Sequence, residues 1–174
     1  MKYLSEIAGK KVCDVNGVDV GEAEDLEISL SEDDIFLRVK GEAMKELRGR
    51  KTEFIPIREI DYVKDRVYLY KRLKELKGIV EEVFMSNTPS YKCMDLIGRL
   101  VTSDNEKVGK VVDFGVDKQA NEVMMLIEGL KVEDVRGKKK EKIPVFEISE
   151  ITSNIRLQHD FETLSKRIVE KRRR

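Results

Sequence analysis

The sequence predicts an all-β fold, strictly a β-dominated α+β fold, built from two tandem small domains that each end in an amphipathic α-helix. Three observations predict it: an internal repeat, apolar residues that alternate with a period of two, and a change to a helical period at the end of each half. Each half of the 174-residue chain holds about 70 to 85 residues. A domain of that size has a small core and no deep pocket, which counts against an elaborate active site.

An internal repeat with a spacing of 88 residues organises the chain. No gap is needed between Gly17 and Lys71, and upstream Gly9 matches Gly98 after the loss of one residue in the second hairpin. The apolar positions keep the same strand phase in both halves. Random similarity would not do this, because a slip of one residue turns every side chain to the other face of a strand. The matched pairs include Gly21 with Gly109, Asp25 with Asp113, Gly41 with Gly129 and Pro56 with Pro144.

Alternating apolar residues predict five strands in each half. The pair Asn16-Gly17 predicts a type I′ turn between the first two strands, because both residue types tolerate a positive φ. Pro56 places the fourth strand at an edge or an end, since proline cannot donate to a ladder. A variable loop is expected over 41–53. In the first half the predicted strands are 11–15, 18–30, 35–40, 54–57 and 66–70.

After the last strand of each half the apolar period changes to about 3.6, which predicts an amphipathic helix. The segment Ser86-Asn87-Thr88-Pro89-Ser90 is the best candidate for a linker. We therefore expect a first domain over 1–84, a linker over 85–91 and a second domain over 92–174. The apolar helix positions are Leu73, Leu76, Ile79, Val80 and Val83 in the first half and Phe161, Leu164, Ile168 and Val169 in the second.

Composition narrows the class of protein. Lys plus Arg and Asp plus Glu both number 34, and charged residues make up 39% of the chain, a pattern typical of thermophilic proteins and suggestive of an archaeal source. No apolar run is long enough for a membrane helix and the N-terminus lacks a signal sequence, so a cytoplasmic location is expected. Cys13, Cys93 and the single His159 form no zinc or nucleophile pattern, and no phosphate-binding loop is present. We expect no catalytic residue, no cofactor, no metal and no enzymatic activity.

One order of glycines, acidic turn residues and apolar strand positions occurs in both halves. In the first half it is Gly9, Val12, Asp14 to Gly17, Val20-Gly21, Asp25 to Ile28 and Ile55-Pro56-Ile57, which recur as Gly98, Val101, Asp104, Val108-Gly109, Asp113 to Val116 and Ile143-Pro144-Val145. This order resembles the PRC-barrel family, which is named from the photosynthetic reaction centre H subunit and also occurs in the ribosome-maturation factor RimM. The resemblance covers about 3–71 and 92–158, and it implies that each half is a small β-barrel. Its matched positions are structural, so it implies a fold and a binding role but no catalytic residue.

Basic residues form the candidate interaction sites. Both halves place a basic cluster at one position of the domain, which is either a solvated hairpin tip or a contact for phosphate or an acidic partner. The C-terminal helix is basic on one face and apolar on the other, whereas the segment 1–34 is acidic. That helix is expected to dock by its apolar face and to offer its basic end to an acidic surface. The candidate residues are Arg48, Arg50, Lys51, Arg136, Lys138, Lys139, Lys140, Lys166, Arg167, Lys171, Arg172, Arg173 and Arg174.

Two functional classes remain. In the first, the protein is a non-enzymatic adaptor or scaffold for protein partners, and archaeal proteins that resemble the family suggest an association with cell division. In the second, by resemblance to RimM, it binds ribosomal protein or RNA in ribosome maturation. Tyr62, Tyr68 and Tyr70 are expected to pack on or beside a strand, which counts against stacking on RNA bases. Self-association is a further candidate, and RNA and a membrane surface rank below protein partners.

Overall fold

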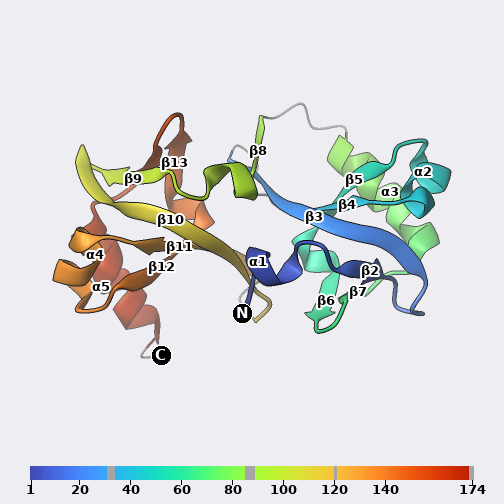
Figure 1. Cartoon of the computed structure of the whole chain (residues 1–174), viewed down its shortest axis with the longest axis horizontal. Coiled ribbons are helices and arrows are strands. Elements are labelled where there is room, and N and C mark those ends of the chain that lie inside the picture. Colours follow the sequence, from blue (N-terminus) through green and yellow to red (C-terminus); the bar gives the residue numbers. More distant parts are fainter. Residues whose placement is uncertain (31–33, 85–88, 120, 173–174) are drawn as a thin grey trace. The chain divides into compact units, whose positions relative to one another are not determined.

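The computed structural model describes residues 1–30, 34–84, 89–119 and 121–172 (Figure 1). The chain divides into two compact units. Unit 1 is Met1–Asp95 with Val116–Glu122, and unit 2 is Leu96–Gly115 with Val123–Arg174. Part of the predicted linker, 85–88, lies outside the described residues, and the predicted domain boundary stays a prediction. Residues 89–95 belong to unit 1, although in sequence they begin the second repeat.

Unit 1 contains a mixed sheet in the order β5-β4-β3-β2-β7-β6, with β8 added to β3. All of these pairs are antiparallel except β2 with β7, which is parallel. Its elements are β1 (Lys2–Tyr3), α1 (Leu4–Ile7), β2 (Lys11–Cys13), β3 (Asp19–Ser29), β4 (Asp34–Lys40), α2 (Glu42–Arg48), β5 (Thr52–Pro56), η1 (Ile57–Glu59), β6 (Ile60–Val63), β7 (Val67–Leu69), α3 (Leu73–Phe84) and β8 (Ser90–Lys92). The short helix η2 (Cys93–Leu96) leads into unit 2.

Unit 2 repeats this topology, with the strand order β12-β11-β10-β9-β14-β13. Its elements are β9 (Leu100–Ser103), β10 (Glu106–Asp117), β11 (Glu122–Glu128), α4 (Leu130–Arg136), β12 (Lys140–Pro144), η3 (Val145–Glu147), β13 (Ile148–Ile151), β14 (Ile155–Leu157) and α5 (Phe161–Arg172). A β-dominated fold of two units is therefore confirmed. Pro56 and Pro144 end the edge strands β5 and β12, as expected for proline. The closure of each sheet into a barrel stays a prediction.

Two pairs of glycines repeat because the backbone approaches its neighbour very closely where β4 and β11 end beside β3 and β10; we call these two places the glycine crossings. A Cβ atom on Gly41 would lie 2.7 Å from the Cα of Gly21, and one on Gly129 would lie 2.6 Å from the Cα of Gly109. Real Cβ atoms do not approach other atoms so closely, so only glycine fits at these crossings. The repeated glycines therefore record a packing constraint of the fold.

The turn between β2 and β3 differs from the predicted type. Of the pair Asn16-Gly17 only Gly17 has a positive φ, 79°, so the predicted type I′ turn is wrong. The turn is held instead by the Asp14 carboxylate, whose Oδ1 accepts hydrogen bonds from the backbone N–H groups of Asn16 (2.8 Å) and Val18 (2.9 Å). The second hairpin has lost one residue. There Asp104 (φ 47°) and Asn105 (φ 66°) are both left-handed, which is the backbone of a type I′ turn.

The segment 41–53 is not a loop, because it contains α2, and the equivalent segment of the second repeat contains α4. Both helices have seven residues and end at a left-handed glycine, Gly49 or Gly137. Each buries one side chain in the core, Met44 or Val132. One buried position gives no helical period, which is why the apolar pattern did not reveal them. The four-residue strand β6 was missed for a similar reason.

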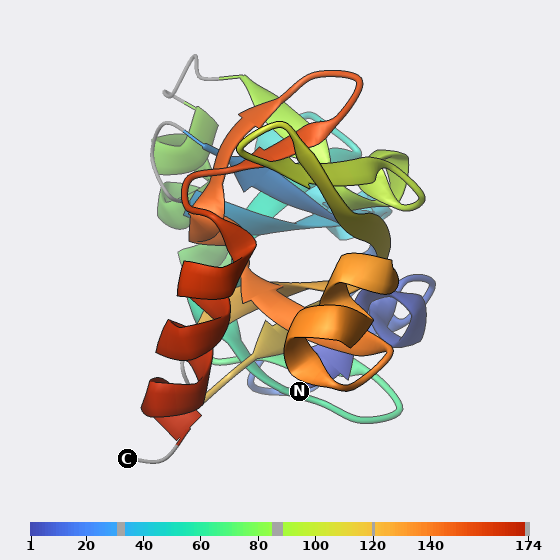
Figure 2. The same ribbon diagram turned by 90° about the vertical axis from the view of Figure 1, so that its left-hand side faces the viewer.

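The two longer helices follow the predicted pattern. Leu76 and Val80 of α3 are buried, and so are Phe161 and Leu164 of α5, whereas Ile168 is half-buried. Helix α3 packs against β5, and α5 lies beside α4 (Figure 2). The predicted docking of α5 by its apolar face is thus confirmed for its first two turns. None of the helices within the described residues is long and apolar enough to cross a membrane.

Candidate interaction surface

Two of the candidate basic residues point into the protein. Arg48 ends α2 and Arg136 ends α4, and their side chains are only 16% and 12% exposed. Each faces a glutamate that is 1% exposed, Glu53 on β5 and Glu141 on β12. The predicted hairpin tip is therefore a helix end, and its first arginine ties that helix to the neighbouring strand rather than to solvent.

The two buried ion pairs differ in geometry. Arg136 Nε donates to Glu141 Oε2 at 2.6 Å, and Lys138 Nζ lies 3.1 Å from the same oxygen. In the first repeat Arg48 Nε and Glu53 Oε1 are 3.8 Å apart, and neither atom has a hydrogen-bond partner among the described residues. Burial raises the pKa of Glu53, while the charges of Arg48 and Arg50 act in the opposite direction. Arg48 instead extends Nη1 to Glu81 on α3 at 2.9 Å. The Arg48–Glu53 pair is thus the looser of the two ion pairs.

Three of the other basic candidates, Lys51, Lys138 and Lys140, form local ion pairs. Lys51 Nζ lies 2.8 Å from Glu42, and Lys140 Nζ lies 3.6 Å from Glu128. Exposed pairs of this kind stabilise a fold by about 0 to 1 kcal/mol. Lys139 and Lys166 are exposed, and the guanidinium of Arg167 lies 3.5 Å from the ring of His159. The side chains of Lys171 and Arg172, and all of Arg173 and Arg174, lie outside the described residues. A partner contact at any of these positions stays a prediction.

His159 lies immediately before α5, and its ring contacts a carboxylate. Its Nδ1 is 2.8 Å from Oε2 of Glu147, a buried residue of η3. Ser103 donates its hydroxyl hydrogen to the backbone oxygen of His159 at 3.0 Å rather than to the ring. The described residues hold no cluster of His, Cys, Asp and Glu that could bind a metal ion. Cys13 and Cys93 are both buried, as expected for small apolar residues.

The tyrosines of the β6–β7 hairpin correct another expectation. Tyr62 and Tyr70 are 42% and 52% exposed, so these side chains face outward rather than packing into the core. The rings of Tyr62 and Tyr68 stack on each other with centroids 4.5 Å apart and an interplanar angle of 22°. The signal for this face was present in the sequence. Val67 and Leu69 alternate with Tyr68 and Tyr70, so one pair must face away from the core when the other is buried.

Cations surround these rings. Lys64 Nζ lies 5.4 Å from the centroid of Tyr62, and Lys118 Nζ lies 5.6 Å from that of Tyr70, both within the range of cation–π contacts. Lys118 also donates to the backbone oxygen of Ile57 at 3.2 Å. Burial lowers the pKa of Lys118, and the charges of Asp61 and Glu59 oppose that shift. We call this surface the tyrosine hairpin, and define it as Tyr62, Tyr68 and Tyr70 with Lys64, Arg66 and Lys118.

The described part of the second repeat has no such surface at the equivalent position. Tyr62 pairs across the hairpin with Tyr68, and the equivalent cross-strand pair of β13–β14 is Glu150 with Arg156. These two side chains form an ion pair at 3.7 Å, and both are exposed. Gln158 occupies the position of Tyr70. The same backbone position therefore carries aromatic rings in one repeat and an ordinary solvated ion pair in the other.

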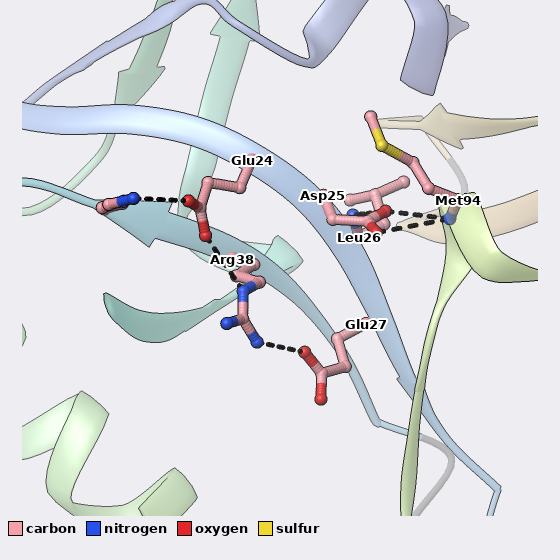
Figure 3. A network of polar contacts seen from close by, with 7 residues as sticks. Glu24, Asp25, Leu26, Glu27, Arg38 and Met94 are labelled. Atoms are coloured by element: carbon pink, nitrogen blue, oxygen red, sulfur yellow. Dashed lines mark hydrogen bonds and ion pairs between the residues drawn. The ribbon is translucent and has the colours of Figure 1, made fainter. Parts of the chain in front are cut away.

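A second polar feature of unit 1 also lacks a counterpart. Figure 3 shows Arg38 on β4 between two glutamates of β3: its Nε donates to Glu24 at 3.0 Å and its Nη1 to Glu27 at 3.4 Å. Lys40 reaches the other oxygen of Glu24 at 3.5 Å. The equivalent positions of the second repeat are Val112, Gly115 and Leu126, which carry no charge. The network thus fixes the β3–β4 face of unit 1 only.

Beside this network, the Asp25 carboxylate accepts hydrogen bonds from backbone N–H groups. Oδ1 accepts a hydrogen bond from Leu26 N at 2.7 Å, and both oxygens lie within 3.3 Å of Met94 N (Figure 3). Burial raises the pKa of Asp25, and the N–H groups of Met94 and Leu26 oppose that shift. Asp113 accepts from Phe114 N at the same 2.7 Å. Both carboxylates therefore hold backbone N–H groups in place.

The comparisons with known proteins agree with the fold of the first repeat. The family described as PRC-barrel domain matches residues 1–72. A search of curated proteins gives no match. The matched region covers strands β2 to β7 of the first repeat's sheet and therefore includes the β6–β7 hairpin that carries the tyrosines.

Proposed function

The chain carries a PRC-barrel domain over residues 1–72, and from this premise we propose that it is a non-enzymatic adaptor that binds a protein partner through the tyrosine hairpin. A PRC-barrel is consistent with a small binding or scaffold module. The observation that carries the proposal is the outward-facing stack of Tyr62 and Tyr68, flanked by Tyr70 and by cations. Tyrosine and arginine are the residue types most enriched at the centres of protein interfaces.

The chemistry of the surface indicates the kind of partner. The rings offer apolar area at a low cost in side-chain entropy, since the stack already fixes two of them. Lys64 and Arg66 are exposed at the tip of the hairpin. Arg66 also lies 3.8 Å from Asp65 and donates to Cys13 Sγ at 3.4 Å, and the charges of both cations would face carboxylates of the partner. The expected partner therefore presents an apolar patch rimmed by acidic residues. Its affinity should fall with salt, because the rim contributes through exposed charges.

The non-enzymatic role is part of the proposal and rests on the resemblance, whose matched positions are structural and carry no catalytic residue. Association with archaeal cell division rests on the resemblance alone and, like a cytoplasmic location, remains part of the proposal.

Binding to ribosomal protein or RNA is the second candidate. The exposed tyrosines favour RNA binding, whereas the sequence had led us to expect packed tyrosines, which counted against it. Nucleobases stack on exposed aromatic side chains, and cations beside the rings would contact phosphates. Against it stands the small extent of the surface, because the second repeat offers an ion pair at the same position. A nuclease treatment separates the two candidates, since only an RNA-dependent partner is lost on RNA digestion.

The experiment exchanges the surface chemistry of the two repeats. The double variant Y62E/Y68R gives the first hairpin the pair that the second hairpin already uses, so the fold should be retained. Wild type, this variant and the control E150A/R156A are used to capture partners from a lysate of the source organism, with and without nuclease. The proposal predicts a nuclease-resistant protein partner that Y62E/Y68R loses by at least about tenfold and the control keeps. Equal capture by all three proteins would remove the tyrosine hairpin as the binding surface.

A further inference from the structure

We propose that the β3 edge from Asp25 to Ser29 is a docking site for an extended peptide segment, and that it accepts residues 89–95 from a second copy of this chain. In the structure the same site is filled by β8 of the same chain. The ligand class is thus a short strand with a following helical turn, recognised through its backbone. This interaction is independent of the tyrosine hairpin.

The geometry of the site is that of strand addition. One edge of β3 pairs with β4 along most of its length, and the other edge pairs with β2 only as far as Glu22. β8 fills the remaining part of that second edge, with Ser90 opposite Ser29 and Lys92 opposite Glu27. Ser90 also donates its hydroxyl hydrogen to Glu27 Oε1. Main-chain pairing of this kind gives affinity, and side chains at alternate positions give specificity.

Asp25 would destabilise the protein if the β3 edge had no segment docked on it. The carboxylate is 4% exposed and receives one N–H from the adjacent residue Leu26 and another from Met94 in the docked segment. Without the segment this buried carboxylate would lose the backbone donor that Met94 supplies from outside β3, and Cys93, which is fully buried, would leave the core. The edge therefore requires an occupant, whichever chain supplies it.

The docked segment belongs in sequence to the second repeat. With the spacing of 89 residues that holds upstream of the first hairpin, Lys92–Leu96 corresponds to Tyr3–Ile7, and η2 corresponds to α1. Residues 116–122 of the second repeat also lie in unit 1, where Lys118 contacts Ile57. Everything after residue 88 can therefore be regarded as one exchangeable element that brings both segments to unit 1.

Exchange between copies would make the same contacts as the closed chain. Which form predominates then depends on the effective concentration that the connection between α3 and β8 imposes, on the order of millimolar for a short linker. At micromolar protein the closed monomer should predominate. At about 1 mM protein, roughly half of the molecules refolded together should carry a segment from another copy. A shorter connection should move that balance towards exchange.

Disulfide trapping tests the proposal on the full chain. Ser29 and Ser90 are directly opposite each other, so S29C in one copy and S90C in another can join only if β8 of one copy docks on β3 of the other. The two single variants are mixed, unfolded, refolded together at about 1 mM and oxidised, and the linked peptides are identified by mass spectrometry. The matched control mixes K11C with E22C, which are also paired but lie within one hairpin of the first repeat.

The proposal predicts a 29–90 disulfide between copies, at least about tenfold above the control and falling steeply on refolding at about 10 µM. The double variant S29C/S90C should form the bond within one chain, which shows that the geometry permits it. Deletion of Asn87 and Thr88 should raise the yield between copies at low concentration. If the double variant links readily while the mixed single variants stay unlinked at every concentration, with or without the deletion, exchange does not occur and the proposal is wrong.

Discussion

The β6–β7 hairpin of the first repeat and the β13–β14 hairpin of the second have the same register and opposite surface chemistry. Tyr62 and Tyr68 stack where Glu150 and Arg156 form an ion pair. The inward residues of the two hairpins stay aliphatic and buried. Duplication has therefore kept the core and the strand phase while leaving the outer faces to diverge. The difference teaches that the shared positions report on the fold, and that the surface we propose for binding lies among the unshared positions.

Substitutions at the glycine crossings should cause the largest loss of stability, and the loss should be equal in the two repeats. G21A would place a Cβ 2.5 Å from the Lys40 carbonyl oxygen, and G109A would place one 2.3 Å from that of Glu128. Both backbones must move, so each variant should lose about 3 kcal/mol or more of unfolding free energy in denaturant titrations.

Gly78 provides the matched control for these crossings. It lies in the interior of α3, and a Cβ atom added there would have no other atom within 4 Å among its non-local neighbours. G78A should therefore raise the unfolding free energy by about 0.5 to 1 kcal/mol. A mild effect of G21A beside a severe one of G109A would show that the two crossings are not equivalent.

The buried ion pairs should differ between repeats. E141Q breaks a close pair at 2.6 Å and should cost about 3 kcal/mol at neutral pH. E53Q acts on a pair at 3.8 Å whose buried carboxylate has a raised pKa, so it should cost about 0 kcal/mol at that pH. Thermal and urea unfolding of both variants measure this difference. Equal losses would mean that the looser geometry of Arg48 and Glu53 has no energetic consequence.

The pH dependence of E53Q sharpens this comparison. Burial raises the pKa of Glu53 above its ordinary value of 4.5, so the folded state binds its proton more tightly than the unfolded state does. The stability that Glu53 contributes is therefore fully present below about pH 4.5 and is lost as the pH rises through the folded pKa. The advantage of wild type over E53Q should shrink over that rise, and an advantage that grows with pH would contradict the assignment.

Substitutions at the first hairpin turn of each repeat should lower the unfolding free energy by smaller amounts, and the two losses should differ. Asp14 holds its own hairpin and also accepts a hydrogen bond from Leu73 N at the start of α3, at 2.9 Å. Ser103, which lies 89 residues further along the chain at the end of β9, donates one hydrogen bond to the backbone of His159. D14A should cost about 1 to 2 kcal/mol and S103A about 0.5 to 1. Circular dichroism during thermal unfolding compares the two, and a larger loss for S103A would overturn the role given to Asp14.

The effect of Asp14 should also depend on pH. Burial opposes its ionisation, but the backbone N–H groups of Leu73, Val18 and Asn16 outweigh burial and lower its pKa below the ordinary 3.8. The stability it contributes is therefore present above about pH 3.8 and is lost as the pH falls through the folded pKa. The difference between wild type and D14A should disappear in that acidic range.

The sequence was a good guide wherever one period extended over many residues. The spacing of 88 and the helical residues Leu76 and Phe161 predicted the repeat, the strand phase and the two long helices correctly. Short elements escaped, since α2 and α4 bury one side chain each. The turn at Asn16-Gly17 was misjudged because the carboxylate of Asp14 determines its geometry, and no dipeptide rule contains that contact.

The candidate surface was harder to predict than the fold. Arg48 and Arg136 look like members of basic clusters, and only the position of α2 and α4 turns them towards buried glutamates. The tyrosine hairpin could have been found from the alternation of Val67, Tyr68, Leu69 and Tyr70. The position of Lys118 beside the Tyr70 ring could not have been predicted, because Lys118 comes from a segment about 50 residues away.

Hydrogen–deuterium exchange tests the central claim most directly, which is that the first hairpin binds and the second does not. The full chain is compared alone and with the protein partner captured in the nuclease-treated lysate. We predict that the partner slows exchange over 60–70 and leaves exchange over 148–158 unchanged, because only the first hairpin presents the stacked tyrosines. Slower exchange confined to 148–158, or unchanged exchange at both hairpins in a saturated complex, would contradict the account.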